Sequence, residues 1–345
     1  MEDIELYNFS TDILNTITKE LNQSYYADFD EKIVIKFSTE DEINAYAKVL
    51  PTGDHCIVIT YEYIKAIYDD AVEFCNFITR AQTDIYFQKF FIGLSEATML
   101  PQSFTFEDNI KNMFVNSLTW TYFHELGHLV QKHGLVRDSD SINIQEFHAM
   151  SDAEELTGAS AVYSHVTEIA ADYYGVKSVL LELFRHWKGQ SKLLVDSVYI
   201  FVCSLTSCFY RFYGNKSLII NSTPHGSHPH PIIRAELTNQ INVEFLDLVL
   251  SINCPPYLNR KTIVHFCYRA ALATSLFWFQ KYEKDKDDIL AFMMKGVLNR
   301  QESKDYMNTI ITTWDKILPT IEANALDTNS LTLLSFTDQF RDIVK

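Results

Sequence analysis

Residues 121–128 read TYFHELGH, and they lie near the end of a longer stretch, 104–132, whose spacing predicts one continuous helix. Thr105 is expected to cap the start of this helix and Gly134 to stop it. Its inward face is expected to comprise Ile110, Phe114, Val115, Leu118, Thr121, His124 and His128. The helix would therefore carry its two histidines into the interior of the protein.

The residues His124-Glu125-Leu126-Gly127-His128 form the pattern H-E-x-x-H, which the composition of the chain would produce by chance only about 0.02 times. Since positions i and i+4 of a helix point the same way, the two histidines can bind one metal ion. Glu125 lies about 100° round the helix, where its carboxylate can hold a metal-bound water without being a ligand. The pattern predicts one zinc ion (Zn2+) per chain. The alternative is a pair of core histidines that are hydrogen-bonded to a carboxylate.

A third ligand is expected from residues 165–172, which read HVTEIAAD. Glu168 and Asp172 are one helical turn apart, so Glu168 can bind the metal while Asp172 accepts a hydrogen bond from an imidazole and fixes its tautomer. Gly175 follows about one turn later, where the missing side chain lets two helices pack closely. The alternative is a solvated acidic helix face, which the apolar residues 169–171 disfavour. Other candidates for the third ligand are Glu146, His148, Asp152 and His165.

The overall charge and composition exclude some classes of protein. The chain has 345 residues, enough for about two domains or one large one, and 47% of them are apolar, which suffices for a buried core. Its net charge of −16 argues against binding to nucleic acid and against electrostatic docking on anionic membranes. No nucleic-acid or membrane partner is therefore expected.

Three features of the sequence predict a cytoplasmic location. Residues 1–5 are acidic and lead into no apolar segment, so no signal peptide is expected. The stretches 197–210 and 262–280 fall short of the roughly 20 apolar residues that a membrane helix needs. The six cysteines include no C-x-x-C pair and are most simply buried thiols of a reducing compartment.

The rest of the chain predicts a mainly α fold of the α+β class. A small α/β region is expected at residues 1–100, followed by a helical domain at 101–345 that holds the H-E-x-x-H motif. Strands are expected at 32–37 and 55–60, and a helix is expected over 61–81. Further helices are expected at 154–187, 193–213, 232–251, 260–283 and 303–325, with loops at 137–152 and 214–231.

Three motifs, in this order, resemble those of the gluzincin zinc metallopeptidases. They are H-E-x-x-H at 124–128, E-x-x-A-D at 168–172, and H-P at 228–229 with Arg234 six residues after the histidine. The third motif is similar to that of the HtpX and CAAX prenyl protease family. The same order also occurs in the Lit family of phage-exclusion peptidases, which resembles this chain in lacking transmembrane helices. The resemblance covers about residues 123–234.

The resemblance implies a zinc-dependent endopeptidase that acts on a protein substrate. The implied zinc ligands are His124, His128 and Glu168. It also implies that Glu125 is the general base, that His228 or a nearby tyrosine stabilises the oxyanion, and that Arg234 organises the site. The likeness to the Lit family further implies cleavage of a host protein in phage defence, after activation by a protein or peptide trigger.

Some histidines allow more than one interpretation. His225, His228 and His230 stand so close together that they could instead form an accessory metal site or a polar loop. His133 is five residues past His128 and so lies off the side of the helix that carries the ligands. It is expected at the surface, or as a hydrogen-bond partner of a ligand.

Two other functions agree with the same motifs. One is a zinc-binding regulatory or interaction protein without peptidase activity, although a structural zinc site has no need of the base Glu125. The other is a general quality-control peptidase like HtpX, which the expected absence of membrane segments disfavours.

Overall fold

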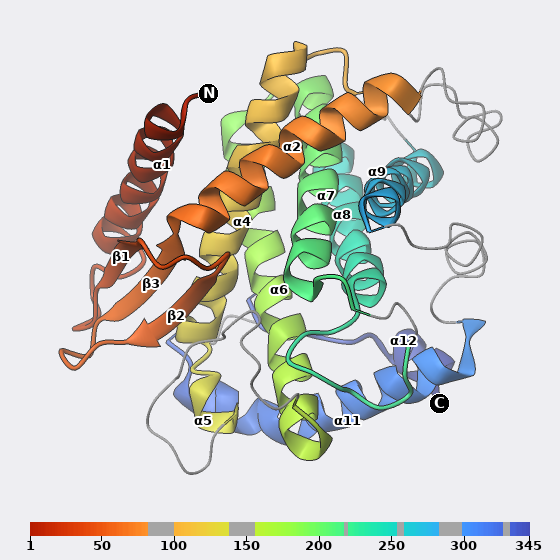
Figure 1. Ribbon diagram of the computed structural model, residues 1–345. Coiled ribbons are helices and arrows are strands. Elements are labelled where there is room, and N and C mark those ends of the chain that lie inside the picture. The colour runs from red at the N-terminus through yellow and green to blue at the C-terminus, as the bar shows by residue number, and fades with distance from the viewer. Residues whose placement is uncertain (82–99, 138–155, 217–219, 254–258, 283–298, 327–331) are drawn as a thin grey trace.

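The computed structural model describes residues 1–81, 100–137, 156–216, 220–253, 259–282, 299–326 and 332–345. These residues form a mainly helical fold with a small three-stranded sheet near the N-terminus, which confirms the predicted fold class (Figure 1). The helices are α1 (Asp3–Gln23), α2 (Tyr61–Ala81), α4 (Phe106–Val130), α5 (Gly134–Arg137), α6 (Gly158–His186), α7 (Ser191–Tyr213), α8 (Pro231–Asn253), α9 (Arg260–Lys281), α11 (Gln301–Asn324) and α12 (Asp338–Val344).

The sheet has the strand order β1-β3-β2, so β2 is an edge strand. Its strands are β1 (Ile33–Ser38), β2 (Ala45–Val49) and β3 (His55–Thr60). The central strand β3 is fully buried and pairs in parallel with β1 and antiparallel with β2. The sequence predicted β1 and β3 but missed β2, because its five residues AYAKV carry no strong strand pattern. Backbone pairing with β3 defines this strand.

Helix α4 carries the H-E-x-x-H motif and runs through the middle of the molecule (Figure 1). It begins as predicted, because the Thr105 hydroxyl accepts from the backbone N–H of Asp108 at 3.1 Å. From Asn109 onward almost every residue is buried, since α2, α6, α7 and β2 all pack on it. The residues predicted to face inward are buried, apart from the half-buried Val115, but the other sides of the helix are buried as well. The predicted stop is wrong, because α4 ends at Val130 and Gly134 begins α5.

Helices α4 and α6 pack closely because each presents a glycine to the other. A Cβ atom on Gly175 of α6 would lie 3.1 Å from the backbone nitrogen of His124. A Cβ atom on Gly127 of α4 would lie 3.1 Å from the Cβ of Tyr174. Interiors are too densely packed to absorb such atoms without a shift of the helices. The two glycines thus set the distance between the H-E-x-x-H helix and the helix that carries Glu168.

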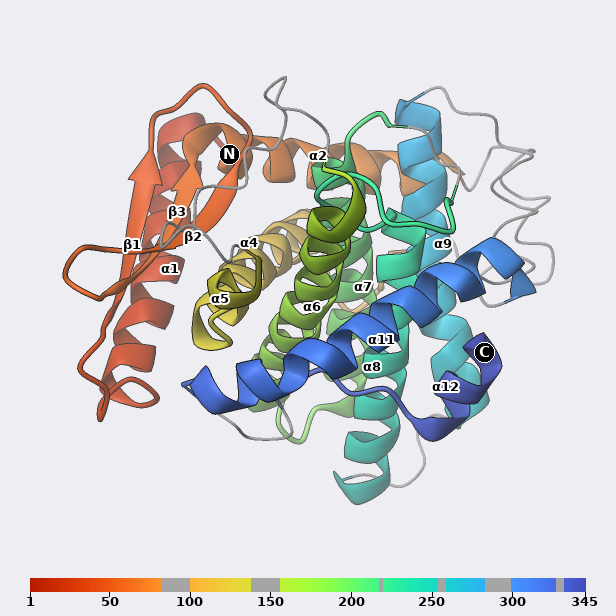
Figure 2. The same ribbon diagram turned by 90° about the horizontal axis from the view of Figure 1, so that it is seen from below.

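The other predicted helices are found close to their expected bounds. Helices α7, α8, α9 and α11 begin and end within two residues of the prediction, whereas α6 begins four residues later, at Gly158. The short helices α5 and α12 were not predicted, and neither was α1. In the view from below, α11 crosses α6, on which it packs (Figure 2). The predicted loop 137–152 lies outside the described residues apart from Arg137.

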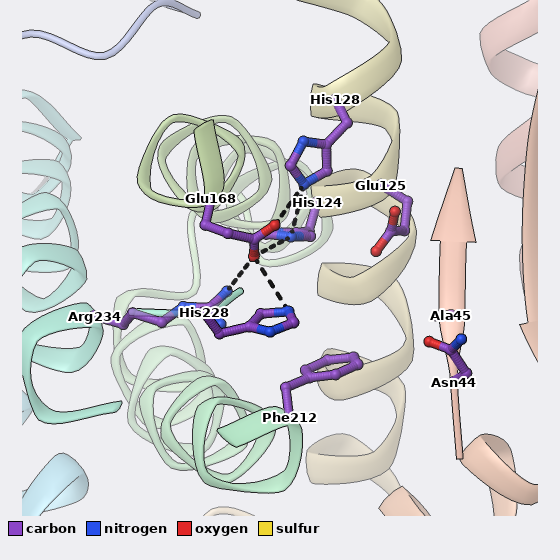
Figure 3. A pocket seen from close by; sticks show the side chains of 9 residues that line it. All are labelled: Asn44, Ala45, His124, Glu125, His128, Glu168, Phe212, His228 and Arg234. Atoms are coloured by element: carbon purple, nitrogen blue, oxygen red, sulfur yellow. Dashed lines mark hydrogen bonds and ion pairs between the residues drawn. The ribbon is translucent and has the colours of Figure 1, made fainter. Parts of the chain in front are cut away.

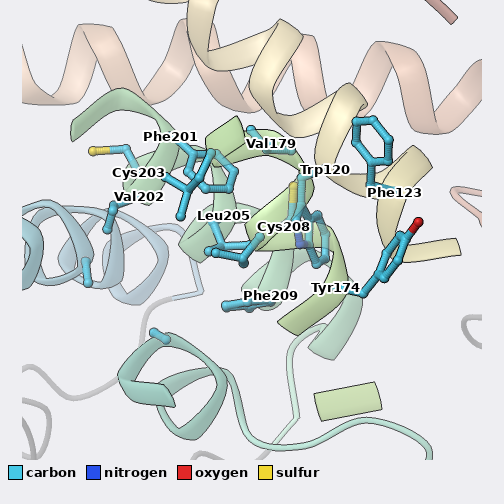
Figure 4. Packing of buried hydrophobic residues seen from close by; sticks show 14 of the residues in the cluster. Trp120, Phe123, Tyr174, Val179, Phe201, Val202, Cys203, Leu205, Cys208 and Phe209 are labelled. Atoms are coloured by element: carbon cyan, nitrogen blue, oxygen red, sulfur yellow. The ribbon is translucent and has the colours of Figure 1, made fainter. Parts of the chain in front are cut away.

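One buried apolar cluster extends from α1 to α12, and Figure 4 shows the part of it around Trp120, Phe201 and Phe209. Helix α7 is long and apolar enough to cross a membrane, but 89% of its most apolar window is buried inside the protein. Five cysteines lie in the described residues and all five are buried and free. The division of the chain into regions 1–100 and 101–345 stays a prediction.

Candidate metal centre

Four segments of the chain bring the predicted site residues together (Figure 3). Helix α4 supplies His124, Glu125 and His128, and α6 supplies Glu168. The loop before α8 supplies His228, and β2 with the residue before it lies opposite. A small cavity is lined by Asn44, Ala45, His124, Glu125, His128, Glu168, Phe212, His228 and Arg234. Its free space of about 10 Å³ corresponds to roughly one water molecule.

Three buried side chains direct nitrogen and oxygen atoms at one point. The Nε2 atoms of His124 and His128 are 3.2 Å apart. The Oε2 atom of Glu168 lies 3.4 Å from Nε2 of His124, and its Oε1 atom lies 3.3 Å from Nε2 of His128. All three residues are at most 7% exposed. This is the arrangement expected of metal ligands, one from each side chain.

The distances fit a small metal ion. Ligand atoms at about 2.0–2.1 Å from a tetrahedral ion are about 3.3 Å from one another. The two Nε2 atoms are 3.2 Å apart, and each lies 3.3–3.4 Å from one of the two carboxylate oxygens of Glu168. In addition, Oε2 of Glu168 is buried and accepts no hydrogen bond from the described residues. The group can therefore bind a metal ion. Two imidazoles and one carboxylate form a donor set that favours zinc over magnesium or calcium.

The other ring nitrogen of His124 is held by Asp172. The Nδ1 atom of His124 lies 2.9 Å from Oδ1 of Asp172. Arg234, which is 1% exposed, donates two hydrogen bonds to the same carboxylate at 2.7 and 2.6 Å. Because a carboxylate only accepts, Nδ1 is the nitrogen that carries the proton when His124 is neutral, and Nε2 then has the lone pair that a metal can bind. Asp172 and Arg234 thus orient the ligand His124, and neither contributes a ligand atom itself.

The electrostatics of the cluster favour one extra positive charge. Burial opposes a charge on His124, but the carboxylates of Glu168 and Asp172 raise its pKa to about 9. Burial and the positive charge of Arg137 lower the pKa of His128 to about 3. At neutral pH the metal-free group therefore holds one extra proton, on His124, and a bound cation would replace that proton.

Glu125 is buried and stands beside the three ligands, and burial raises its pKa to about 7. Figure 3 shows its carboxylate facing the space between the ligands and β2. A carboxyl group whose pKa is close to the working pH can both take up and release a proton. Its position beside the ligands, rather than among them, is the one expected of a general base.

His228 borders the cavity, whereas His225 and His230 do not. The ring of His228 stacks on Phe212, with centroids 6.0 Å apart, and its Nε2 lies 3.7 Å from Oε2 of Glu168. Burial lowers the pKa of His228 to about 4, so this ring is neutral. His230 instead accepts a hydrogen bond from the backbone in the first turn of α8, and His225 is exposed. The alternative of an accessory metal site formed by these three histidines is not supported, because their side chains do not form a metal-binding group.

The structure also tests the other candidate ligands. His165 is engaged elsewhere, with Nδ1 2.8 Å from the Tyr306 hydroxyl and Nε2 3.1 Å from the carbonyl oxygen of Gly226. His133 is buried rather than at the surface, and it contacts His128. The remaining candidates, Glu146, His148 and Asp152, lie outside the described residues.

Three cavity neighbours were missed by the sequence analysis. Arg137 donates a 3.0 Å hydrogen bond to Oε1 of Glu168 and another to the hydroxyl of Thr167. Asn44 and Phe212 line the side opposite the ligands. None of these residues belongs to a motif, and they meet the site through the packing of distant segments. No pattern in the sequence could have found them.

Comparison with known proteins adds no identification, since no protein-family model, no curated protein and no solved structure matches the chain. The resemblance to the gluzincin families therefore stays a prediction that rests on the three motifs.

Proposed function

We propose that the protein is a zinc-dependent peptidase that hydrolyses peptide bonds in a protein substrate. The observation that carries the proposal is the pairing of two features in one cavity. One is the ligand group His124, His128 and Glu168, whose spacing fits a tetrahedral ion. The other is the buried carboxyl group of Glu125, which is not a ligand and has a pKa near 7. A metal with a purely structural role does not need the second feature.

The three ligands would hold the zinc ion, which supplies Lewis acidity and lowers the pKa of a water molecule toward about 7. Glu125 accepts a proton from the attacking water and delivers it to the amine that leaves. His228 is placed to donate a hydrogen bond from Nε2 to the substrate carbonyl oxygen as that oxygen gains negative charge. This requires that the Ser227 hydroxyl, 2.9 Å from Nδ1 of His228, donates to it.

The edge strand β2 supports a peptide as the class of substrate. Within the described residues β2 pairs with β3 alone, and Asn44 and Ala45 at its start line the cavity opposite Glu125. An extended peptide can add to such an edge through backbone hydrogen bonds. The Asn44 carboxamide, from a residue only 3% exposed, makes no hydrogen bond to another described side chain or backbone group and can bind the peptide backbone.

The proposed biological setting rests on sequence resemblance alone. The Lit-like order of motifs supports cleavage of a host protein in phage defence. The free space of the cavity, about one water molecule, is small for a peptide backbone. This supports the proposal that an activating protein or peptide acts as a trigger.

The test is a proteome-wide comparison of cleavage products between wild-type protein and Glu125→Gln, in cells with and without phage. We expect the variant to keep its zinc and its fold but to lose at least about 10²–10⁴-fold in cleavage rate, as is typical for loss of a general base. The matched control is Glu107→Gln, the same change at an exposed position of α4. Cleavage by Glu125→Gln at the wild-type rate would remove this residue from the mechanism.

The near-closed cavity also suits a second function, that of a zinc-binding regulatory protein without peptidase activity. Full zinc occupancy with no product that depends on Glu125, in any of the cell samples, would favour this alternative. Broad cleavage of unfolded proteins would instead favour a quality-control peptidase.

A further inference from the structure

Gln131 and His133 form a chain of hydrogen bonds behind the metal ligand His128. The Nδ1 atom of His128 lies 2.9 Å from Nδ1 of His133. The other ring nitrogen of His133, Nε2, lies 3.0 Å from the side-chain oxygen of Gln131. Gln131 and His133 are each 1% exposed, so water does not compete for these bonds. Neither residue lines the cavity.

The orientation of the Gln131 amide decides which atoms of this chain carry protons. Its Nε2 group donates to the backbone carbonyl of Thr332 at 3.4 Å, so its oxygen faces His133. Because an amide oxygen only accepts, Nε2 of His133 must carry a proton. His133 is buried, and among the described residues its two ring nitrogens contact only an imidazole and an amide oxygen, so no carboxylate in contact offsets a positive charge. The ring is therefore neutral, which leaves Nδ1 with a lone pair.

The proton between the two histidines must then belong to His128. A neutral His133 with its proton on Nε2 can only accept at Nδ1, so Nδ1 of His128 donates. The Nε2 atom of His128 is consequently unprotonated, and this is the atom that faces His124 and Glu168. If Gln131 turned its NH2 group toward His133, the same logic would place the proton of His128 on Nε2 and block metal binding.

We propose that Gln131 and His133 are positioning residues, which hold His128 in the tautomer that can bind metal. The proposal rests on the metal centre of the proposed function but not on peptidase activity. It assigns a role to the C-terminal segment as well, because the Thr332 carbonyl orients the amide. The backbone N–H of Leu326 donates to the carbonyl of Val130 at 2.9 Å and docks the same segment at the end of α4.

The two histidine ligands are thereby oriented by unlike means. His124 is held by a carboxylate, Asp172, which Arg234 fixes in place. His128 is held by neutral groups, His133 and Gln131, whose donors and acceptors are fixed in turn by the Thr332 carbonyl and the Gln131 amide oxygen. A neutral chain adds no negative charge, so it fixes the tautomer of the ligand without raising its affinity for a second proton.

The first test uses wild-type protein without metal, so it needs no variant to fold. Nitrogen NMR of protein labelled with 15N-histidine distinguishes the two neutral tautomers of each ring. We expect a proton on Nδ1 of His128 and on Nε2 of His133. Observation of His128 with its proton on Nε2 in the folded, metal-free protein would overturn the proposal.

The second test measures the affinity of the metal-free protein for Zn2+ by competition with a chelator. Gln131→Leu removes the acceptor and should weaken zinc binding by about 10–100-fold, as loss of a ligand's hydrogen-bond partner does. Gln131→Glu keeps an acceptor toward His133 but adds a negative charge, which favours a second proton on His133 and hence a proton on Nε2 of His128. It should therefore also bind zinc more weakly than wild type. Equal zinc affinities for Gln131→Leu and wild type would show that the chain is only structural. Since no readout is peptidase activity, this result is independent of the Glu125→Gln experiment.

Discussion

Two clusters of charged side chains, the metal centre and the Asp70 cluster, are each built around a buried carboxylate but in opposite ways. The Asp70 cluster consists of Asp70, Glu73, Arg211 and Lys281 and joins α2, α7 and α9. Asp70 is 3% exposed, accepts from Nε of Arg211 at 2.8 Å and from Lys281 at 2.9 Å, and Lys281 also contacts Glu73 at 2.6 Å. Every contact in this cluster joins a donor to an acceptor.

In the metal centre, by contrast, lone pairs face one another. The Nε2 atoms of His124 and His128 are 3.2 Å apart, and both oxygens of Glu168 lie within 3.4 Å of them. Such a group is unfavourable unless a proton or a cation lies among its atoms. The difference teaches that an ion-pair cluster satisfies its own charges, whereas acceptors that converge on one point can bind a cation.

The largest expected effect is the loss of the metal itself. Each of His124→Ala, His128→Ala and Glu168→Ala should purify without the one zinc ion per chain that the wild type binds, because each removes one of three protein ligands. Metal analysis of the purified proteins checks this. Glu182→Ala is the matched control, since it removes a surface carboxylate of the same helix as Glu168.

An unchanged zinc content in Glu168→Ala would move the third ligand to another residue. The contrast between the metal centre and the Asp70 cluster would then no longer hold, since Glu168 would not act as a metal ligand.

The Asp70 cluster should respond in stability and not in metal content. Asp70→Asn removes the charge that Arg211 and Lys281 share, and it should lower the free energy of unfolding by about 1–3 kcal/mol, because both cations are partly exposed and Lys281 keeps its contact with Glu73. Urea unfolding of the metal-free protein measures this loss. Zinc per folded molecule should equal that of wild type, and a loss of zinc in this variant would couple the two clusters.

A smaller effect is expected at His228, within the metal centre but outside the ligands. His228→Ala should lower turnover by about 10²–10³-fold and leave zinc content unchanged, as loss of an oxyanion donor does. His225→Ala and His230→Ala are the controls, because neither side chain lines the cavity. If His228→Ala loses zinc rather than turnover, this histidine belongs with the ligands.

The smallest effect is the dependence of zinc affinity on pH. The pKa of His124 is raised to about 9, so a metal ion must displace one proton from it at neutral pH. Between about pH 9 and pH 7 the affinity should therefore fall by about tenfold per pH unit. Calorimetric or competitive titration at several pH values checks this, with Asp70→Asn expected to give the same slope. A flat profile would mean that His124 is neutral in the metal-free protein.

The stability of the metal-free protein should change with pH in the opposite direction. A histidine whose pKa is raised in the folded state stabilises that state fully below its unfolded pKa of about 6.5. This stabilisation is lost as the pH rises through the folded value of about 9. The metal-free protein should thus become less stable over the range in which its zinc affinity increases.

Much of the fold could be predicted because it follows local patterns in the chain. The cap at Thr105, the strand His55–Thr60 and the ends of α7, α8, α9 and α11 all depend on residues that are near one another in sequence. The edge strand β2 could not be predicted in this way, because its short sequence becomes a strand by pairing with β3. The burial of the other sides of α4 could not be predicted for a similar reason, since it depends on neighbours from distant parts of the chain.

The sequence by itself determined that His124 and His128 point the same way, because helix geometry places residues i and i+4 on one face. It also placed Glu168 and Asp172 one turn apart, and the structure brings both to the histidines. The tertiary structure alone decided how near they come, through the close contact of Gly175 with His124. It likewise decided the surroundings of the site, where the residues that were missed or left open are Asn44, Gln131, His133, Arg137 and Phe212. The physical reason is that spacing along one helix follows from the backbone, whereas contacts between distant segments depend on the packing of the whole core.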